Sequence, residues 1–237
     1  MNAATRMPAL LLGAVLGLLV LSGISPQTDR LTWFLETFPV MIGAVVLLAT
    51  WPRFPLTPLL CSLIAVHAVI LIVGGYWSYS EVPLFDWLRD LFGWSRNHYD
   101  RVGHVAQGFV PAVIAREILI RRSPLRPGRW LFFLVTCVAL AFSAFYELIE
   151  WWSAVAFGDG ATAFLGTQGD TWDTQWDMFL ALLGALSSQV LLAGLHDAPG
   201  RVTLPGFYDV VRPIDPQERA ELARLPMGDD VFLRNTG

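Results

Sequence analysis

The stretch GDTWDTQWDMFLALLG, from Gly169 to Gly184, places three aspartates directly before an apolar run that continues to Leu195. These aspartates are Asp170, Asp173 and Asp177. If a helix begins at Asp170, spacings of three and four put all three carboxylates on one helix face. An acidic face that leads into an apolar span is unsuited to lipid contact. We therefore expect a membrane-spanning helix whose acidic face is turned toward other helices.

The composition of the chain points to the same class of protein. Of its 237 residues, 54% are apolar and only 15% are charged, whereas soluble domains carry about 25% charged residues. Low charge combined with long apolar runs is typical of an integral membrane protein. The net charge of −4 comes with no basic stripe, so we do not expect nucleic acid as a partner. Cys61 and Cys137 lie inside apolar runs and support neither a disulfide framework nor a cysteine zinc site.

The apolar runs predict an all-α fold, a polytopic membrane helix bundle of about six transmembrane helices plus one interfacial helix. The expected spans cover residues 8–24, 35–51, 59–77, 102–120, 130–152 and 170–195. We interpret the first as an uncleaved span, because no clear small-x-small cleavage site follows it. Residues 1–195 form the expected membrane domain. Residues 196–237 form an expected cytoplasmic, partly disordered tail, in which residues 215–225 resemble a capped short helix.

The connection before the fourth span contains an amphipathic segment, PLFDWLRDLFGW, from Pro83 to Trp94. In a helix its apolar face would hold Leu84, Trp87, Leu88, Leu91 and Phe92, and its polar face Asp86, Arg89 and Asp90. Two such faces, with tryptophans on the apolar one, indicate a helix that lies on the membrane surface. A packing helix of the kind found in soluble proteins is the alternative.

The distribution of arginines predicts the orientation in the membrane. The short loop after the fourth span, residues 121–129, is strongly basic, which is typical of cytoplasmic loops. With six spans both termini lie on the same side, so we expect both in the cytoplasm. Eight arginines then lie inside, at positions 6, 53, 116, 121, 122, 126, 129 and 201, and four lie outside, at positions 30, 89, 96 and 101.

This topology brings ionisable residues of the last three spans to the extracytoplasmic side. They are His104 in the fourth span, Glu147 and Glu150 in the fifth, and Asp173 and Asp177 in the sixth. Glu147 and Asp177 each lie five residues from a tryptophan anchor, about 7 Å at the helical rise per residue. The predicted spans therefore place these side chains at a common depth.

Charged groups at this depth need compensation, because an unpaired charge near mid-membrane costs about 2–3 kcal/mol. Arg96 and Arg101 are the nearest expected cations, so the acids require either protons or a bound divalent cation. We predict His104, Glu147 and Asp177 as catalytic residues. The predicted ligands of a divalent metal are His104, Glu147, Glu150, Asp173 and Asp177. This ligand set suits Mg²⁺, Mn²⁺ or Ca²⁺, and zinc is also compatible.

Structural alternatives exist for several of these residues. Asp170 and Asp173 have the spacing of an N-cap and a capping box, and the remaining acids are also compatible with a static ion-pair cluster. Among the other histidines, we expect His98 in a loop, His67 as a satisfied core residue and His196 as a cation at a helix end.

Five stretches resemble the YjdF-like family of bacterial inner-membrane proteins, over about residues 25–195. They are DRLTWFLETFPV (29–40), VPLFDWLRD (82–90), SRNHYDRVGHVAQGFVPA (95–112), AFYELIEWW (144–152) and FLGTQGDTWDTQWDMFLALLGA (164–185). The resemblance implies a multi-pass protein of the bacterial inner membrane and supplies no activity.

A second set of residues is similar in order and spacing to VanZ-like membrane proteins. The corresponding positions are Asp100, Arg101 and His104, then Glu147 or Glu150, then Asp173 or Asp177 with Gly184. This similarity implies cell-envelope chemistry.

Three functions are compatible with the sequence. The first is a metal-dependent envelope enzyme that acts on a lipid-linked, headgroup or other small-molecule substrate, with membrane lipids as partners. The second is a proton- or ion-coupled transporter, and the third is a non-catalytic structural protein. Apart from His67, the inner half of the expected bundle consists mainly of Leu, Val, Phe and Ala. This favours a one-sided site over a conducting path.

Overall fold

The computed structural model describes residues 3–196. The expected tail beyond this range, including the predicted helix at residues 215–225, lies outside the described residues, as does the side chain of His196. The described chain is all-α, as predicted, and contains no strand. Its elements are α1 (Ala3–Ile24), α2 (Arg30–Thr50), α3 (Pro58–Trp77), α4 (Pro83–Phe92), α5 (Tyr99–Arg122), α6 (Arg129–Phe157), a 3₁₀ turn (Gly158–Ala161), α7 (Thr162–Leu165) and α8 (Asp173–His196).

Five of the described helices, α1, α2, α3, α6 and α8, are long and apolar enough to cross a membrane. The helix expected as a further span, α5, has 24 residues, or about 36 Å of helix, which exceeds the thickness of a bilayer core. Its sequence is less apolar than those of the other five helices. However, its polar residues Asp100, His104, Arg116 and Glu117 are all buried. Its composition therefore reflects an interior position, and the predicted polytopic helical bundle is confirmed.

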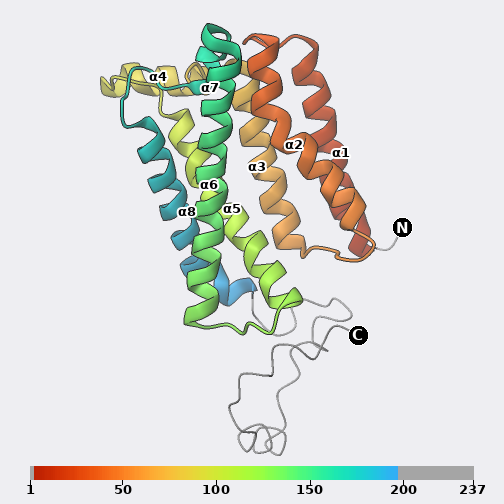
Figure 1. Ribbon diagram of the computed structural model, residues 1–237. Helices are drawn as coiled ribbons and strands as arrows, with labels where there is room; N and C mark the ends of the chain where they lie inside the picture. The colour runs from red at the N-terminus through yellow and green to blue at the C-terminus, as the bar shows by residue number, and fades with distance from the viewer. Residues whose placement is uncertain (1–2, 197–237) are drawn as a thin grey trace, which may run out of the picture. The chain divides into compact units, whose positions relative to one another are not determined.

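Helix α5 connects two groups of helices (Figure 1). On one side α3 packs against α1 and α2, and on the other side α6 packs against α8, while α5 contacts α3, α6 and α8. Apolar side chains fill the first group, with a core of Val15, Leu19, Val40, Ala68 and Ile72. Leu60 of α3 and Val113 of α5 belong to the buried cluster that joins the two groups.

The contact between α5 and α8 is made by backbone against backbone. A Cβ atom on Gly108 would overlap the carbonyl of Ala181, and one on Gly184 would overlap the carbonyl of Val105. Ala181 and Ala185 on the same face of α8 are fully buried. Small residues at such a crossing let two membrane helices approach closely. The crossing aligns the first turns of α5 and α8, which carry the acidic residues.

Helix α4 lies across the end of the bundle where α5 begins (Figure 1). None of its residues is buried, and Leu84, Trp87, Leu91 and Phe92 are strongly exposed. The helix ends at Gly93, whose φ of 66° is the left-handed conformation that glycine adopts at helix C-termini. An exposed apolar face on a helix across the bundle end fits the predicted interfacial helix.

Several helix boundaries differ from the prediction, and two of them lie beside acidic residues of the last two spans. Helix α8 begins at Asp173 rather than Asp170, because the Asp170 carboxylate accepts a hydrogen bond from the backbone N–H of Trp172 at 2.9 Å and stabilises a turn there. Helix α6 continues to Phe157 instead of ending at Trp152. Glu150 therefore lies about two turns before the helix end, where the macrodipole no longer opposes its charge appreciably.

We predict that Gly108→Leu and Gly184→Leu each prevent the close approach of α5 and α8. A leucine at either position would collide with backbone, so we expect a destabilisation of about 3 kcal/mol or loss of folded protein. Size-exclusion chromatography and thermal unfolding in detergent measure the effect. Gly13→Leu is the matched control, since a Cβ at exposed Gly13 meets no atom within 4 Å. Wild-type stability in both crossing variants would contradict the importance of this contact.

Candidate functional site

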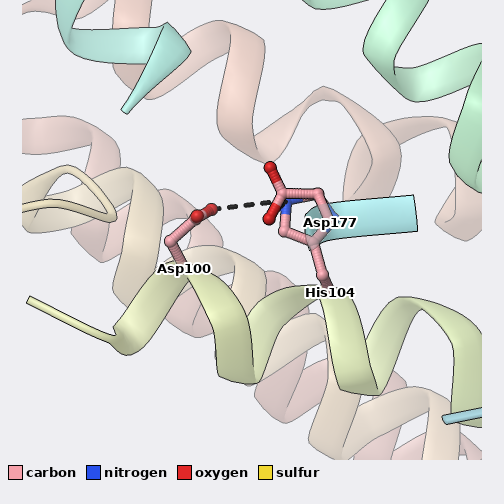
Figure 2. Close-up of side chains that lie close together, drawn as sticks. All are labelled: Asp100, His104 and Asp177. Atoms are coloured by element: carbon pink, nitrogen blue, oxygen red, sulfur yellow. Dashed lines mark ion pairs between the residues drawn. The ribbon is translucent and has the colours of Figure 1, made fainter. Parts of the chain in front are cut away.

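Five side chains from three helices meet at the end of the bundle where α5 and α8 begin. We call them the acid–histidine cluster, which consists of Asp100 and His104 of α5, Glu147 and Glu150 of α6, and Asp177 of α8. The imidazole of His104 is at its centre. Its Nε2 atom lies 3.3 Å from Asp100 Oδ1 and 3.7 Å from Asp177 Oδ1, and Figure 2 shows these three side chains. On the other side, Nδ1 lies 4.0 Å from Glu147 Oε1.

Helical spacing explains why these residues share one region. Asp100 and His104 are four residues apart, and Glu147 and Glu150 are three apart, so each pair lies on one face of its helix. Asp177 lies one turn before Ala181, which contacts Gly108 of α5 through its backbone. The glycine crossing therefore directs Asp177 toward His104.

Several atoms of the cluster are buried without a hydrogen-bond partner. The side chains of His104, Glu147 and Asp177 are 6%, 6% and 4% exposed. Within the described part of the chain, neither carboxylate oxygen of Glu147, nor Oδ1 of Asp177, nor Nδ1 of His104 takes part in a hydrogen bond. Buried polar atoms of this kind are costly, and nearly all in native proteins have a partner. The cluster therefore retains capacity to bind a further group.

A second group of charges adjoins the cluster and is centred on Arg96. We call it the Arg96 ion-pair group. Arg96 is 5% exposed, and its Nη1 lies 2.6 Å from Asp173 Oδ1 and 3.5 Å from Asp170 Oδ2. Its Nη2 lies 3.3 Å from Asp100 Oδ2. Arg101 reaches Asp170 at 3.5 Å. Asp100 thus contacts both Arg96 and His104 and links the two groups.

The loop that carries Arg96 is fixed by hydrogen bonds to the segment before α8. The backbone N–H of Asn97 donates to Gln168 Oε1 at 2.8 Å, and Gln168 Nε2 donates to the carbonyl of Asn97 at 2.9 Å. Burial alone would lower the pKa of Arg96, but its hydrogen bond to Asp173 and the neighbouring carboxylates raise that pKa above its ordinary value. Arg96 is therefore a permanent cation held at a fixed place.

The charges of the acid–histidine cluster do not balance. The arginines of the Arg96 ion-pair group contact Asp100, Asp170 and Asp173. In contrast, the side chain of His104 is the cationic group that lies within 4 Å of Glu147 and of Asp177 among the residues that the structure describes. A single imidazole contributes at most one positive charge. The remaining acids must bind protons or a cation to remain buried.

The atoms of the cluster have the spacing of a cation site. Donor atoms of Asp100, His104 and Asp177 all lie within 4.8 Å of one another, and so do those of His104, Glu147 and Glu150. A small cavity of about 70 Å³ adjoins them. Its lining includes Glu36, Tyr79, Asp100, His104, Tyr146 and Glu150. Carboxylate oxygens and one imidazole nitrogen are a suitable donor set for a divalent cation.

The structure brings four of the five predicted metal ligands together, namely His104, Glu147, Glu150 and Asp177. It does not bring Asp173 to them, because that carboxylate pairs with Arg96 at the first residue of α8. The catalytic and metal-binding roles stay predictions.

Sequence reasoning missed two acids that belong to this region. Asp100 contacts His104, and its spacing of four residues from that histidine was the available signal. Glu36, at the start of the second expected span, is 3% exposed and lines the same cavity as His104. Its helix begins at Arg30, earlier than predicted, which places Glu36 nearly two turns inside the helix.

The remaining histidines lie apart from the cluster. His98 precedes α5, as a loop residue should, and stacks edge-on against Trp94 with ring centroids 4.8 Å apart. Burial, followed by the charges of Arg101 and Arg96, lowers the pKa of His98. The expectation of a satisfied core histidine at position 67 is wrong, since Nε2 of His67 is buried and no described residue forms a hydrogen bond with it.

The expectation of an almost entirely apolar inner half is also wrong. Glu117 is fully buried, accepts a hydrogen bond from Thr57 at 3.1 Å and pairs with Arg121 at 2.8 Å. Arg121 also donates to the carbonyl of Pro55 at 2.8 Å and so ties the α2–α3 loop to the end of α5. Between α6 and α8, Gln189 donates to Thr136 at 2.9 Å. Polar groups are therefore present far from the acid–histidine cluster.

Comparisons with known proteins agree with the helical membrane fold. Residues 7–198 match a protein family described as "Predicted membrane protein (DUF2238)". The chain is also similar to "Inner membrane protein YjdF" of Escherichia coli (strain K12), with 56% identity over 179 residues, which cover 76% of this chain and 85% of the relative. No solved structure matches the chain. The resemblance to YjdF-like proteins is thereby confirmed.

We predict that Arg96→Gln destabilises the protein by about 3–5 kcal/mol near neutral pH, since it leaves buried carboxylates without their counter-charge. Thermal unfolding in detergent near neutral pH measures this loss. Arg89→Gln on α4, whose ion pairs are largely exposed to solvent, should cost less than about 1 kcal/mol. Equal losses in the two variants would contradict this account.

Proposed function

The chain belongs to the DUF2238 family of predicted membrane proteins, and we propose that its acid–histidine cluster binds a divalent cation and acts on a lipid-linked or headgroup substrate. The protein itself is a multi-pass protein related to an inner-membrane protein. One observation carries the proposal, which is the set of buried, unbonded donor atoms on His104, Glu147 and Asp177. A static ion-pair cluster would leave fewer such atoms: both terminal nitrogens of Arg96 contact aspartates, and only its Nε is buried without a described hydrogen-bond partner.

The identity of the donors favours a hard cation. Four carboxylates and one imidazole surround the region, and no described cysteine takes part, since Cys61 and Cys137 are outside the cluster. Mg²⁺, Mn²⁺ and Ca²⁺ prefer oxygen ligands, while zinc accepts one histidine with carboxylates. Because both three-residue sets share the imidazole of His104, and a neutral imidazole has one nitrogen free to accept, we propose occupancy by one cation rather than two.

The chain's own residues suit acid–base chemistry around such an ion. A bound divalent cation supplies Lewis acidity toward a phosphate or carbonyl oxygen. Asp100 lies beside Nε2 of His104 and fixes the orientation of the ring, while Nδ1 faces Glu147. An imidazole held in this way is a suitable ligand of the cation, and Glu150, which lines the small cavity beside it, is a suitable general acid or base. The buried side chains around it exclude bulk water from the proton that Glu150 would transfer.

The proposed side of action is extracytoplasmic. The cluster lies at the end of the bundle opposite the loop that carries Arg126 and Arg129. Arginine-rich short loops remain on the cytoplasmic side of the inner membrane. The acids would then face the outer leaflet, at the level of the headgroups, and α4 would lie along the same surface. A membrane lipid or a lipid-linked intermediate in the outer leaflet presents its polar group at this level.

Proton-coupled transport is the second candidate, and the buried polar groups of the inner half favour it. Glu117 and Gln189 are both buried in the bundle, and intramembrane acids commonly mark ion paths. In that case the unbonded atoms of the cluster would bind protons instead of a metal. The two candidates therefore differ in the ligand that neutralises Glu147 and Asp177.

We predict that the purified protein binds one Mn²⁺ or Mg²⁺ per chain, and that Asp177→Asn and Glu147→Gln both abolish this binding. Elemental analysis after dialysis and isothermal titration measure it. Saturating cation should stabilise the wild type by about 2.7 kcal/mol at one hundred times the dissociation constant. Asp90→Asn is the matched control, because that carboxylate is 72% exposed on α4.

An absence of bound metal, together with variants that are more stable than the wild type, would sink the metal proposal. Neutralising a buried acid would then relieve repulsion between groups that bind protons. That outcome would support the transport candidate, and proton flux in vesicles that contain the reconstituted protein would be the next measurement.

A further inference from the structure

A second, larger cavity lies among α1, α2, α3 and α5. Its volume is about 360 Å³, within the range of sites that hold small ligands. Its lining is apolar apart from single residues such as His67 and Cys61. The lining includes buried side chains from all four helices, namely Val15, Val40, Ala44, Ala68 and Val110. No part of the acid–histidine cluster lines it.

The apolar cavity adjoins the small cavity beside His104. Pro39, His67 and Leu71 line both of them. His67 therefore stands at the junction, with its Nε2 atom buried and unbonded to any described residue. The small cavity on one side of His67 is lined by Glu36, Asp100, His104 and Glu150 among others, and the larger cavity on the other side has an almost wholly apolar lining. One ligand that occupied both would need a polar end and a long apolar end.

The dimensions suit a hydrocarbon chain. Along α2 the lining of the apolar cavity extends from Pro39 to Trp51, a rise of about 18 Å. Water molecules would form few hydrogen bonds in a space with so few polar partners. If the space were empty, the side chains that line it would lose dispersion contacts. Because the surrounding helices are long and apolar enough to cross a membrane, lipid chains are the apolar ligands present at highest concentration.

We propose that this cavity binds one acyl or isoprenoid chain of a membrane lipid whose headgroup lies at the acid–histidine cluster. The chain enters between the helices and runs from His67 toward Trp51. The headgroup's chemistry rests on the proposed function, whereas the binding of the chain does not. The proposed ligand is thus an anionic lipid, one hydrocarbon chain of which lies in the cavity. Its headgroup is anionic because a phosphate would meet the cation at His104, Glu147 and Asp177.

Gly43 offers a way to fill the cavity without disturbing the fold. It lines the cavity, and a Cβ atom added there meets no other atom within 4 Å. A leucine at this position extends into the space that the chain would occupy and also favours the helix. Gly17→Leu is the matched control, since Gly17 on α1 is exposed, has no neighbour within 4 Å of an added Cβ and does not line the cavity.

The test uses vesicles of phosphatidylethanolamine and phosphatidylglycerol that contain the full chain. The probe is phosphatidylglycerol with a photoreactive diazirine at an internal carbon of one acyl chain, because Val40 and Ala68 lie at the His67 end of the cavity. Peptide mass spectrometry locates the crosslinks. We expect labelling of Val40, Ala68 and Val110, which are buried from the bilayer. Gly43→Leu should reduce this labelling at least about tenfold, a change of about 1.4 kcal/mol in binding, and Gly17→Leu should leave it unchanged.

Labelling confined to lipid-exposed positions such as Val45 and Val46, at equal levels in all variants, would overturn the proposal. If Gly43→Leu fails to fold, the position of the crosslinks in the wild type decides on its own. Titration with Mn²⁺ separates this result from the proposed function. Gly43→Leu should retain cation binding while it loses the chain, and Asp177→Asn should lose the cation while Val40 and Ala68 remain labelled.

Discussion

The backbone contact between α5 and α8 is the constraint on which the rest of the structure depends. Gly108 and Gly184 allow the two helices to approach until carbonyl groups occupy the space of side chains. That approach sets Asp177 beside His104. Any larger residue at the crossing would separate the helices, and the acids of α8 would no longer face an imidazole. The glycines therefore determine the chemistry of a site to which they contribute no side chain.

Around this crossing, two groups of charges have different character. The charges of the Arg96 ion-pair group are paired, because its guanidinium contacts three aspartates and its loop is held by Asn97 and Gln168; only Nε of Arg96 and Nε of Arg101 are buried without a described hydrogen bond. The acid–histidine cluster is open, because His104, Glu147 and Asp177 keep buried atoms without hydrogen bonds. The ion pairs of the first group explain why its charges can be buried. The second group costs stability unless something binds there, and the adjoining apolar cavity would hold the hydrocarbon chain of the lipid that we propose. A headgroup above His67 and a hydrocarbon chain below it would occupy both spaces.

Much of this architecture was predictable from the sequence, and the failures have physical causes. Long apolar runs and helical spacing predicted the spans and the meeting of His104, Glu147 and Asp177, because period and length are local properties. The pairing of Asp173 with Arg96 was not predicted, since it depends on a loop whose conformation no pattern predicts. Glu36 was missed because its helix starts before the apolar run that was used to define it. The end of α6 was missed because Trp152 was interpreted as the interfacial anchor that ends the span, whereas the mostly apolar residues Ser153 to Phe157 continue the helix. The two cavities follow from packing among four helices and have no signature in one sequence.

The central claim is that His104 and its neighbouring carboxylates hold a divalent cation. Pulsed electron paramagnetic resonance of the Mn²⁺-loaded protein tests this claim most directly, because a coordinated imidazole nitrogen modulates the spin echo of the ion. The account predicts nitrogen modulation in the wild type that changes on uniform ¹⁵N labelling and disappears in His104→Gln, while His98→Gln keeps it. An echo modulated by water protons alone in the wild type would contradict the account.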